Sequence, residues 1–436
     1  MDRSGRASLG LTQRGVRGPS FPKAGTEQKP LTGLGTDMPA TSTPRTTSKD
    51  TARAHLALVI ADADWFTTEN LFREVDRPDV STLLLSCVDY YNAWMRGSPP
   101  WRWGRPLTRQ RERLWRRDLV LPSGWMKRFP HLGMRPIRRT IEQWRTHCPE
   151  GARLGLVMTY PHYLYLRDLV RPDINIYFNI DDYSQYWPRC ADRVNALERQ
   201  AVRESALTVC VSKVRCDELR QLVPEAAGRI HHLPHGTPRA LLGAEPQYRP
   251  APPPEDLADL PRPLLGYVGT LEDRIDWPLM IEVARRFPQA SIVLVGRVPA
   301  GRSGTWQEDA RRCLAMPNVH LVGWRSQEEL TRYNRTFDVC LIPYRADHPF
   351  NRVSCPTKIM DYMATGRPIV STALPECRLH ADLFDVTETT ESFLRAIASH
   401  VDGSPDDAQA AARFAWATEH CCANVVERFL DWLPAE

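Results

Sequence analysis

The sequence predicts an α/β protein built from two doubly wound, Rossmann-like units in tandem. Apolar runs of strand length alternate with stretches of helical spacing, and this alternation occurs twice along the chain. A proline-rich break at 246–263 separates the two series, as is typical of an interdomain linker. A chain of 436 residues is also too long for one ordinary core and suits two domains.

The first unit is expected over 51–245, after an N-terminal tail. Residues 1–50 are rich in Gly, Ser, Thr, Pro and Arg without periodicity, so we expect them to be disordered. Helical spacing marks 189–204 and 213–223. Apolar runs predict strands at 55–61, 81–87, 153–160, 174–180, 206–212 and 229–234.

The second unit is expected over 264–404. Its helices include 276–287, with Asp276 as N-cap, 327–336, which a capping box of Ser326 and Glu329 opens, and 356–365. Its strands are predicted at 264–269, 291–296, 318–323, 337–344 and 368–372. Residues 405–436 have an amphipathic pattern and predict a C-terminal helix, over about 405–434, that can cross back to the first unit.

Ligands of such sheets bind beyond the carboxyl ends of the strands, so the predicted site lies in the cleft between the units. Composition excludes several other classes of protein. No apolar run approaches the ~20 residues that span a bilayer, and the first residues lack the apolar core of a secretory signal. The 11 cysteines contain no CxxC, and the histidines show no HExxH spacing. We therefore expect a cytoplasmic protein with reduced thiols, no metal site and no cofactor.

The segment 96–145 is basic and aromatic. It holds 14 Arg or Lys against three acids, and five tryptophans: Trp101, Trp103, Trp115, Trp125 and Trp144. Two interpretations stay open, an anionic membrane surface contacted from the cytoplasmic side and a solvated insertion whose tryptophans pack inward. Nucleic acid is disfavoured, because no helix-turn-helix, RNA-recognition or zinc-finger pattern accompanies the charge.

A second predicted feature is a phosphate-binding helix start near 354–361. Ser354 is expected to cap a helix whose first turn contains Pro356, where the missing N–H costs nothing. Free backbone N–H groups and the positive dipole end at such a start favour phosphate. Lys358 can reach a diphosphate, and Asp361, three residues later on the same face, can accept ribose hydroxyls. The alternative is a surface Lys–Asp pair.

The loop after the strand 264–269 is the expected partner of Lys358. Gly269 lets backbone N–H groups approach a phosphate, and Arg274 supplies a second cation. Tyr344 follows another strand, where it can pack on a base or ribose or belong to the core.

Asp181 and Asp182 are the candidate general bases, at the carboxyl end of the strand 174–180. Two adjacent carboxylates repel, so one is expected to have a raised pKa; a helix cap or turn is the alternative role. Asp62 and Asp64, after the first strand, are weaker candidates. His162 is expected to contact the acceptor or simply to pack.

These motifs together resemble a known family. The runs GYVGTLEDRIDWPLMIEVARRFPQASIVLVG, NVHLVGWRSQEELTRYNRTFDVCLIPY and CPTKIMDYMATGRPIVST resemble the nucleotide-sugar-binding domain of group 1 glycosyltransferases. NIDDYSQYW and LPHGTP are similar to the acceptor domain of a bacterial branch that makes teichuronic-acid-type polysaccharides. The resemblance implies a GT-B fold, a nucleotide sugar donor and a lipid-linked saccharide acceptor. It also implies that Gly296, Gly323, Trp324 and Arg325 hold the base.

Two departures from the family pattern bear on mechanism. Thr270 replaces the usual arginine of the donor loop, which leaves Lys358 and Arg274 to neutralise the diphosphate. Val353 stands where retaining members carry a glutamate, eight positions before the ribose-binding acid. Retention is therefore unsupported, and an inverting reaction is slightly favoured.

Two other functions remain open at the level of sequence. A nucleotide-sugar epimerase shares the fold but needs its own acid and histidine array. A non-catalytic saccharide- or nucleotide-binding protein could keep the fold without turnover. A dehydrogenase is disfavoured, because GYVGTLEDR lacks GxGxxG.

Overall fold

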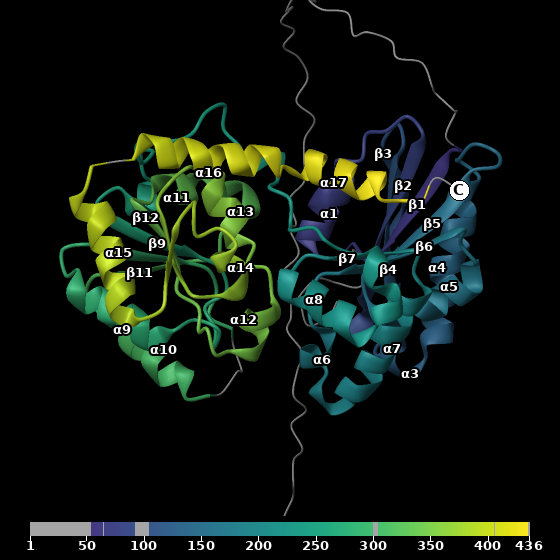
Figure 1. Ribbon diagram of the computed structural model, residues 1–436, viewed down its shortest axis with the longest axis horizontal. Coiled ribbons are helices and arrows are strands. Elements are labelled where there is room, and N and C mark those ends of the chain that lie inside the picture. The colour runs from purple at the N-terminus through teal and green to yellow at the C-terminus, as the bar shows by residue number, and fades with distance from the viewer. Residues whose placement is uncertain (1–53, 64, 92–103, 300–303, 405, 435–436) are drawn as a thin grey trace, which may run out of the picture.

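The computed structural model describes residues 54–63, 65–91, 104–299, 304–404 and 406–434. Figure 1 shows two α/β units side by side, each with a central sheet covered by helices on its faces. The predicted fold class is therefore confirmed. The tail expected over 1–50 lies outside the described residues.

The N-terminal unit contains an eight-stranded sheet in the order β3-β4-β2-β1-β5-β6-β7-β8. All its neighbouring strands are parallel except β3 and β4. β1 lies at the centre and is buried almost throughout, as its apolar run predicts. The strands are β1 (Leu56–Ala61), β2 (Val80–Asp89), β3 (Arg105–Arg111), β4 (Leu114–Leu121), β5 (Arg153–Met158), β6 (Ile174–Asn179), β7 (Leu207–Cys210) and β8 (Ile230–His232).

Two of these strands, β3 and β4, form an antiparallel hairpin inside the Arg/Trp-rich segment and were not predicted. Leu114, Leu119 and Leu121 of β4 are buried against β2. Arg116 lies between Glu69 and Asp118, and forms ion pairs with both. Charged residues therefore interrupt the apolar run that identified the other strands, and their ion pairs allow them to lie at the sheet edge.

The helices of this unit lie on both faces of the sheet (Figure 1). Each buries one stripe; in α4 that stripe includes Met134, Ile137, Ile141 and Trp144. The helices are α1 (Phe66–Arg73), α3 (Trp125–Arg128), α4 (Pro130–Arg145), α5 (Leu164–Val170), α6 (Tyr183–Tyr186), α7 (Ala191–Glu204) and α8 (Lys213–Leu222).

The C-terminal unit has a six-stranded, parallel sheet in the order β11-β10-β9-β12-β13-β14. Its strands are β9 (Leu264–Val268), β10 (Ser291–Val295), β11 (Val319–Gly323), β12 (Val339–Ile342), β13 (Ile369–Thr372) and β14 (Asp385–Thr387). Its helices are α9 (Trp277–Arg286), α10 (Trp306–Leu314), α11 (Gln327–Thr336), α12 (Pro349–Val353), α13 (Lys358–Met363), α14 (Pro375–Arg378) and α15 (Thr390–Asp402). The Asp276 cap and the capping box of Ser326 and Glu329 are both confirmed.

The proline-rich segment 246–263 packs along the C-terminal unit. The Gln247 amide donates to the Thr365 carbonyl at 3.0 Å, and the Ala251 amide to the Arg335 carbonyl at 2.8 Å. The buried Arg367 guanidinium also donates to the Tyr248 carbonyl. These bonds hold the segment against the unit that follows it.

The C-terminal segment forms two helices, α16 (Asp407–Glu419) and α17 (Cys422–Asp431), where one was expected. Thr237 pairs with Cys421 at the break: its amide donates to the His420 carbonyl and its carbonyl accepts from the Cys422 amide. α17 packs on α1, so the chain crosses back and ends on the N-terminal unit, as Figure 1 shows. No helix in the described part of the chain is long and apolar enough to cross a membrane.

Candidate functional site

Three glycines end neighbouring strands of the C-terminal sheet at its cleft edge. Gly269, Gly296 and Gly323 follow or end β9, β10 and β11, and all have positive φ angles. The Gly269 amide donates to the Val295 carbonyl, and the Gly296 amide to the Gly323 carbonyl. A Cβ on Gly296 would lie 1.8 Å from the Gly269 carbonyl oxygen. Side chains are thus excluded here, and the backbone of the loop after β9 is accessible for close approach.

Lys358 reaches this loop from α13. Its side chain is buried, and its Nζ donates to Tyr344 Oη at 2.6 Å and lies 5.0 Å from the ring centroid of Tyr267. A Cβ on Gly269 would meet Nζ at 2.6 Å. The ammonium forms no ion pair with any residue that the structure describes. A buried cation without a counter-charge is costly, so this position favours a ligand anion.

Arg274 is the second cation at this site. Its Nε donates to Glu272 Oε1 at 2.6 Å, and its guanidinium carbon lies 4.7 Å from the Phe350 ring centroid and 5.9 Å from that of Tyr344. Burial acts to lower the pKa of Arg274, but the charge of Glu272 together with Tyr344, Tyr267 and Asp181 outweighs burial, and the net shift is upward. The structure therefore brings Arg274 and Lys358 onto one tyrosine, as a diphosphate site requires.

Tyr344 is buried beneath these cations. Burial acts to raise the pKa of the Tyr344 hydroxyl, but the charges of Lys358 and Arg274 outweigh burial and lower it. The ring supports the two cations and packs edge-on to Tyr267 at 6.2 Å. This is the core role that was one of its two predicted alternatives.

Asp361 lies one turn beyond Lys358 on α13 and is half-buried. Burial raises the pKa of the Asp361 carboxyl to about 7, and the Lys358 charge acts against that rise. No hydrogen bond to this carboxylate is found among the described residues, and hydroxyl donors from a ligand would satisfy it.

The predicted helix start is wrong in detail. α13 begins at Lys358, and Ser354 follows α12 in an extended conformation without capping the next helix. Thr357 precedes α13 and makes no side-chain capping bond. The proline that opens this region does not extend the regular helix, which has only six residues. Any anion here is therefore bound chiefly by side chains and the glycine loop.

Trp324 and Arg325, the predicted base-binding pair, have different environments. Trp324 is 41% exposed after β11, with the Arg297 guanidinium carbon 4.8 Å from its ring centroid. Arg325 instead donates to Asp256 Oδ2 at 2.7 Å and to Tyr333 Oη at 2.8 Å. Its side chain is committed to the segment 246–263, whereas Trp324 is available to a ligand.

Asp181 and Asp182, which follow β6, also differ. Asp182 caps α6, accepting from the Ser184 amide at 3.1 Å and the Ser184 hydroxyl at 2.6 Å. Asp181 is buried; its Oδ2 accepts from Tyr186 Oη at 2.6 Å, and its Oδ1 has no hydrogen-bond partner.

Burial raises the pKa of Asp181 to about 7, against the lowering effects of the Tyr186 hydrogen bond and the Arg274 charge. One carboxyl of the pair thus has a raised pKa, but burial causes the shift more than repulsion by Asp182 does. The charge effect of Arg274 on Asp181 is consistent with the contacts of Phe350 with both Tyr186 and Arg274, which bring the Asp181 loop close to the donor loop.

A buried network that the sequence did not reveal holds the Asp181 loop. Asn179 Nδ2 donates to the Asp181 carbonyl at 2.9 Å and to Glu198 Oε1 at 2.8 Å. Glu198 also accepts from Tyr177 Oη and forms an ion pair with Arg215. Its members come from β6, α7 and α8, so only the fold brings them together.

The remaining acceptor-side candidates pack within the N-terminal unit. His162 is buried, with its ring edge-on to Trp187 at 5.0 Å. Asp62 is buried with a φ of 68°, and its Oδ1 accepts from the Cys87 amide at 3.3 Å. Asp64 lies outside the described residues.

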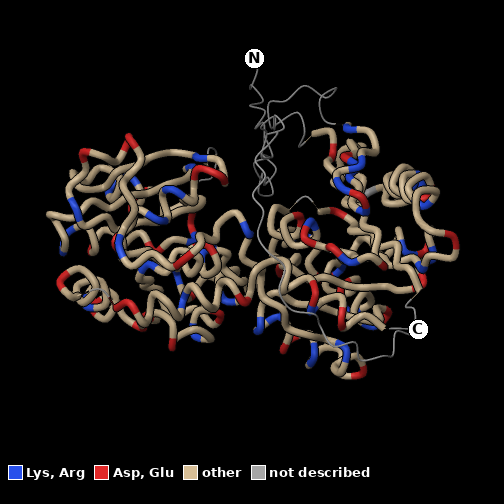
Figure 2. Tube along the Cα trace, turned by 90° about the horizontal axis from the view of Figure 1, so that it is seen from above, with Lys and Arg blue, Asp and Glu red and all other residues tan. Residues whose placement is uncertain are grey.

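Three tryptophans of the Arg/Trp-rich segment pack inward. Trp125 and Trp144 are buried, and Trp115 stacks on His147 with ring centroids 4.4 Å apart. Trp101 and Trp103 lie outside the described residues. Figure 2 shows acidic and basic positions interspersed along the trace of both units.

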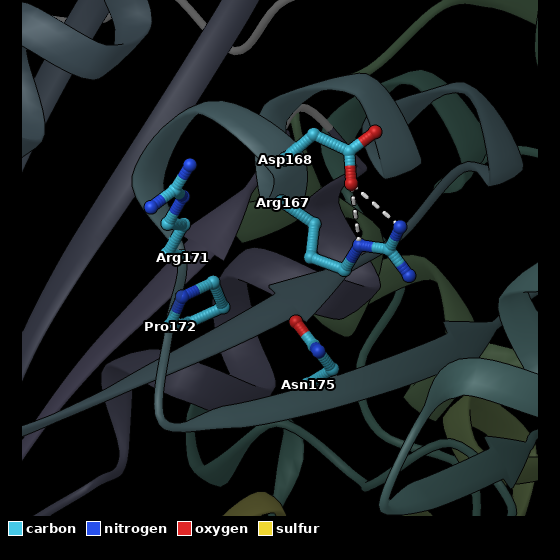
Figure 3. Close-up of a pocket in the computed structure, with 5 residues that line it drawn as sticks. All are labelled: Arg167, Asp168, Arg171, Pro172 and Asn175. Carbon is cyan, nitrogen blue, oxygen red and sulfur yellow. Dashed lines mark hydrogen bonds and ion pairs between the residues drawn. The ribbon is translucent and has the colours of Figure 1, made fainter.

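A separate cavity of about 430 Å³ opens at the amino end of β6, the opposite end of that strand from Asp181. Figure 3 shows its lining residues, among which Arg167 is paired with Asp168. Arg167 also pairs with Glu204, so its charge is already balanced. This cavity is not part of the candidate site. Among the described residues, no group of three or more His, Cys, Asp or Glu side chains could hold a metal ion.

Known proteins are similar to this chain in sequence over part of its length and in structure over most of it. Residues 262–402 match the family described as glycosyl transferases group 1. TuaH of Bacillus subtilis strain 168, provisionally named a teichuronic acid biosynthesis glycosyltransferase, is 26% identical over 237 residues. That match spans 52% of this chain and 57% of TuaH.

Solved structures are similar over most of the chain. Sucrose-phosphate synthase of Thermosynechococcus elongatus aligns with a TM-score of 0.64 at 13% identity, over 86% of this chain and 98% of that one. A UDP-forming trehalose-phosphate synthase of Burkholderia xenovorans gives 0.62 at 12%, over 87% and 98%. HepE of Anabaena, in complex with UDP and glucose, gives 0.55 at 14%, over 86% and 98%. At these identities the likeness shows a shared fold.

Proposed function

We propose that the protein is a group 1 glycosyltransferase: residues 262–402 match that family, and the described chain shares the fold of solved nucleotide-sugar-dependent glycosyltransferases. The protein transfers a sugar from a nucleoside diphosphate donor to an acceptor hydroxyl bound between the two units. The observation that carries this proposal is the buried Lys358 ammonium, which has no ion pair among the described residues and lies against the glycine loop beside Arg274.

In this proposal each part of the donor binds residues whose chemistry suits it. Lys358 and Arg274 face the diphosphate, whose charge offsets the cost of burying them, and the exposed backbone at Gly269 and Gly296 permits close approach. Asp361 accepts the ribose hydroxyls, and Trp324 offers an exposed ring to the base. The two cations stabilise the leaving nucleoside diphosphate, so the proposal needs no metal ion or cofactor.

Asp181 acts as general base in this account. The acceptor hydroxyl attacks the anomeric carbon, its proton passes to Asp181 Oδ1, and the bond from that carbon to the diphosphate oxygen breaks with both electrons leaving on the phosphate. A carboxyl with a pKa of about 7 is well suited to take a proton near neutral pH.

The proposed stereochemical outcome is inversion. Direct attack assisted by one base inverts the anomeric centre, and Asp181 lies on the unit opposite the donor loop. Val353, at the end of α12, provides no carboxylate where retaining members carry glutamate.

We also propose an acceptor at an anionic membrane surface, as a lipid-linked saccharide would be. Phe129 and Leu132, at the start of α4, are 55% and 56% exposed, and Tyr90 is 52% exposed at the end of β2. Arg135 and Arg139 are exposed on the same helix. Apolar side chains beside cations match the interface of an anionic bilayer.

Vesicle sedimentation tests this location. The protein should pellet with phosphatidylglycerol vesicles at low salt and be partly released at high salt, because salt screens exposed charges. The pair Phe129→Ser and Leu132→Ser should weaken pelleting, and Leu222→Ser, at an exposed site on α8, should not. Absence of pelleting at low salt would reject the membrane surface.

A binding and turnover panel tests the function itself. Thermal shifts are measured with UDP, GDP, dTDP, their sugar conjugates and NAD, because a ligand bound only by the folded state raises its melting temperature. A selective shift with one nucleoside diphosphate supports the donor site, and no shift with any of them would reject it. Release of that diphosphate from its sugar conjugate supports transfer. Epimerisation without release would instead favour the epimerase, and binding without turnover the non-catalytic protein.

A further inference from the structure

The Asp181 carboxylate is held from one side only. Tyr186 Oη donates to Oδ2 at 2.6 Å, whereas Oδ1 is buried and finds no hydrogen-bond partner in the part of the chain that the structure describes. Burial and the nearby Asp181 charge both raise the pKa of Tyr186, so its hydroxyl stays protonated and donates. One oxygen is thereby occupied and the other remains to take a proton.

The Tyr186 ring is itself supported by both units of the protein. It packs against Trp65 of the N-terminal unit, with ring centroids 6.3 Å apart. It also lies edge-on to Phe350 of α12 in the C-terminal unit, at 5.6 Å. The Arg274 guanidinium carbon is 4.7 Å from the centroid of the same Phe350 ring. A continuous series of contacts thus leads from the Asp181 carboxylate to the donor-side cation.

We propose that Tyr186 is the positioning residue of the reaction: it binds Asp181 Oδ2, leaves Oδ1 as the proton acceptor, and lies correctly only while Phe350 of the other unit, itself in contact with Arg274, supports its ring. This rests on the proposed function and deepens it, because it ties the orientation of the base to the closeness of the two units. Tyr186 then orients the base only when the two units lie close together and the donor loop faces Asp181. This arrangement favours sugar transfer over premature reaction of the donor with water.

Other charged and titratable groups also act on the Asp181 carboxyl. Arg274 and Arg215 lower its pKa, Asp182 raises it, and burial raises it most. The Asp181 charge in turn shifts the pKa values of Tyr183, Tyr186, Arg274 and Cys355 upward or supports such a shift. Tyr186→Phe removes only the Tyr186 hydroxyl and leaves the other three groups in place, so it isolates the hydrogen bond while it keeps the ring contacts.

The test is a pH titration of the Asp181 carboxyl by carbon NMR on the full chain with labelled aspartate. The signal that disappears in Asp181→Asn identifies this carboxyl. Because the lost bond favours the charged form, its midpoint should rise by about half a pH unit or more in Tyr186→Phe. Tyr333→Phe is the matched control, because the Tyr333 hydroxyl also donates to an aspartate: its Oη lies 2.7 Å from Asp256 Oδ2, and neither residue contacts Asp181. It should leave the midpoint unchanged.

A second variant and a second readout complete the design. Phe350→Leu keeps the hydroxyl but removes its aromatic support, and should shift the midpoint less and in the same direction. The acidic limb of the pH profile for diphosphate release should move to higher pH together with the carboxyl midpoint. The rate at pH 6 should therefore fall by about threefold or more. An unmoved midpoint in both variants would overturn the role of Tyr186. Failure of the proposed function would appear separately, as no diphosphate release by the wild type, because the carboxyl titration needs no turnover.

Discussion

At the scale of single residues, burial decides which of two adjacent aspartates can act as a base. Asp182 is held by the amide and hydroxyl of Ser184 as a helix cap, whereas Asp181 is buried with one oxygen unpartnered. The sequence predicted the pair but left the choice open. Separating them requires knowledge of α6, Tyr186 and the opposite unit, none of which local spacing reveals.

Asp181 should destabilise the protein at alkaline pH. Its folded pKa of about 7 lies above the ordinary aspartate value of 3.8, so the folded chain holds this proton more tightly than the unfolded chain does; the resulting stabilisation is fully present below the unfolded pKa and is lost as pH rises through about 7. Asp181→Asn removes the charge, and should raise the free energy of unfolding at pH 8 by up to about 4 kcal/mol, with little effect at pH 4. Urea unfolding at both pH values measures this.

The neighbouring residue gives the control for this prediction. Asp182→Ala removes the α6 cap and should lower stability at pH 8 by about 0.5–2 kcal/mol. A destabilised Asp181→Asn at pH 8 would show that this carboxylate is better solvated than its burial indicates.

At the scale of elements, the close contact of two strand ends explains why glycine is required after β10. Gly296→Ala should cost about 3 kcal/mol or more, because the added Cβ would lie 1.8 Å from the Gly269 oxygen and φ is +158°. Gly228→Ala, where a Cβ meets nothing within 4 Å, should change stability by less than about 0.5 kcal/mol. Equal costs in chemical denaturation would contradict the proposed close contact.

The elements also show how far sequence reasoning reaches. Apolar runs such as 55–61 and 291–296 predicted strands that the structure contains as β1 and β10. The hairpin of β3 and β4 was missed because charged residues such as Arg116, neutralised by Glu69 from α1, interrupt its apolar pattern. The break between α16 and α17 was missed because Thr237, distant in sequence, makes it.

The candidate site was predictable in the same uneven way. Lys358, Gly269 and Asp361 belong to motifs with recognisable spacing, and the structure groups Lys358 with Arg274 on Tyr344. Tyr186 and Phe350 come from different units and meet only in the folded chain. Contacts between units leave no periodic signal in either segment.

At the scale of the whole molecule, contacts made by α14 and by α17 help to join the units outside the proposed site. Glu376 of α14 accepts from the Lys213 amide at the start of α8 at 3.0 Å, and bonds His232 Nε2 at 3.1 Å. α17 forms the other contact, with Phe429 edge-on to Phe72 at 5.2 Å and Phe178 at 6.1 Å. Contacts in both α14 and α17 thus hold the two units next to each other.

Phe429 should therefore contribute strongly to the stability of the N-terminal unit. Phe429→Ala removes a fully buried ring, and should lower the free energy of unfolding by about 3–5 kcal/mol. Leu222→Ala, at a half-exposed site on α8, should have an effect below about 0.5 kcal/mol. A loss below about 1 kcal/mol for Phe429→Ala would mean that α17 does not anchor the chain end to this unit.

Titration calorimetry of the nucleoside diphosphate selected by the thermal panel, with wild type, Lys358→Ala and Lys213→Ala, tests the central claim most directly. Lys213 is the matched control, because its ammonium pairs with Asp217 on α8. We expect Lys358→Ala to lose binding by about a hundredfold or more while keeping its fold, since a buried charge-assisted contact to phosphate is removed. Lys213→Ala should bind as the wild type does. Undiminished affinity in Lys358→Ala would show that the diphosphate is bound elsewhere and would contradict the account.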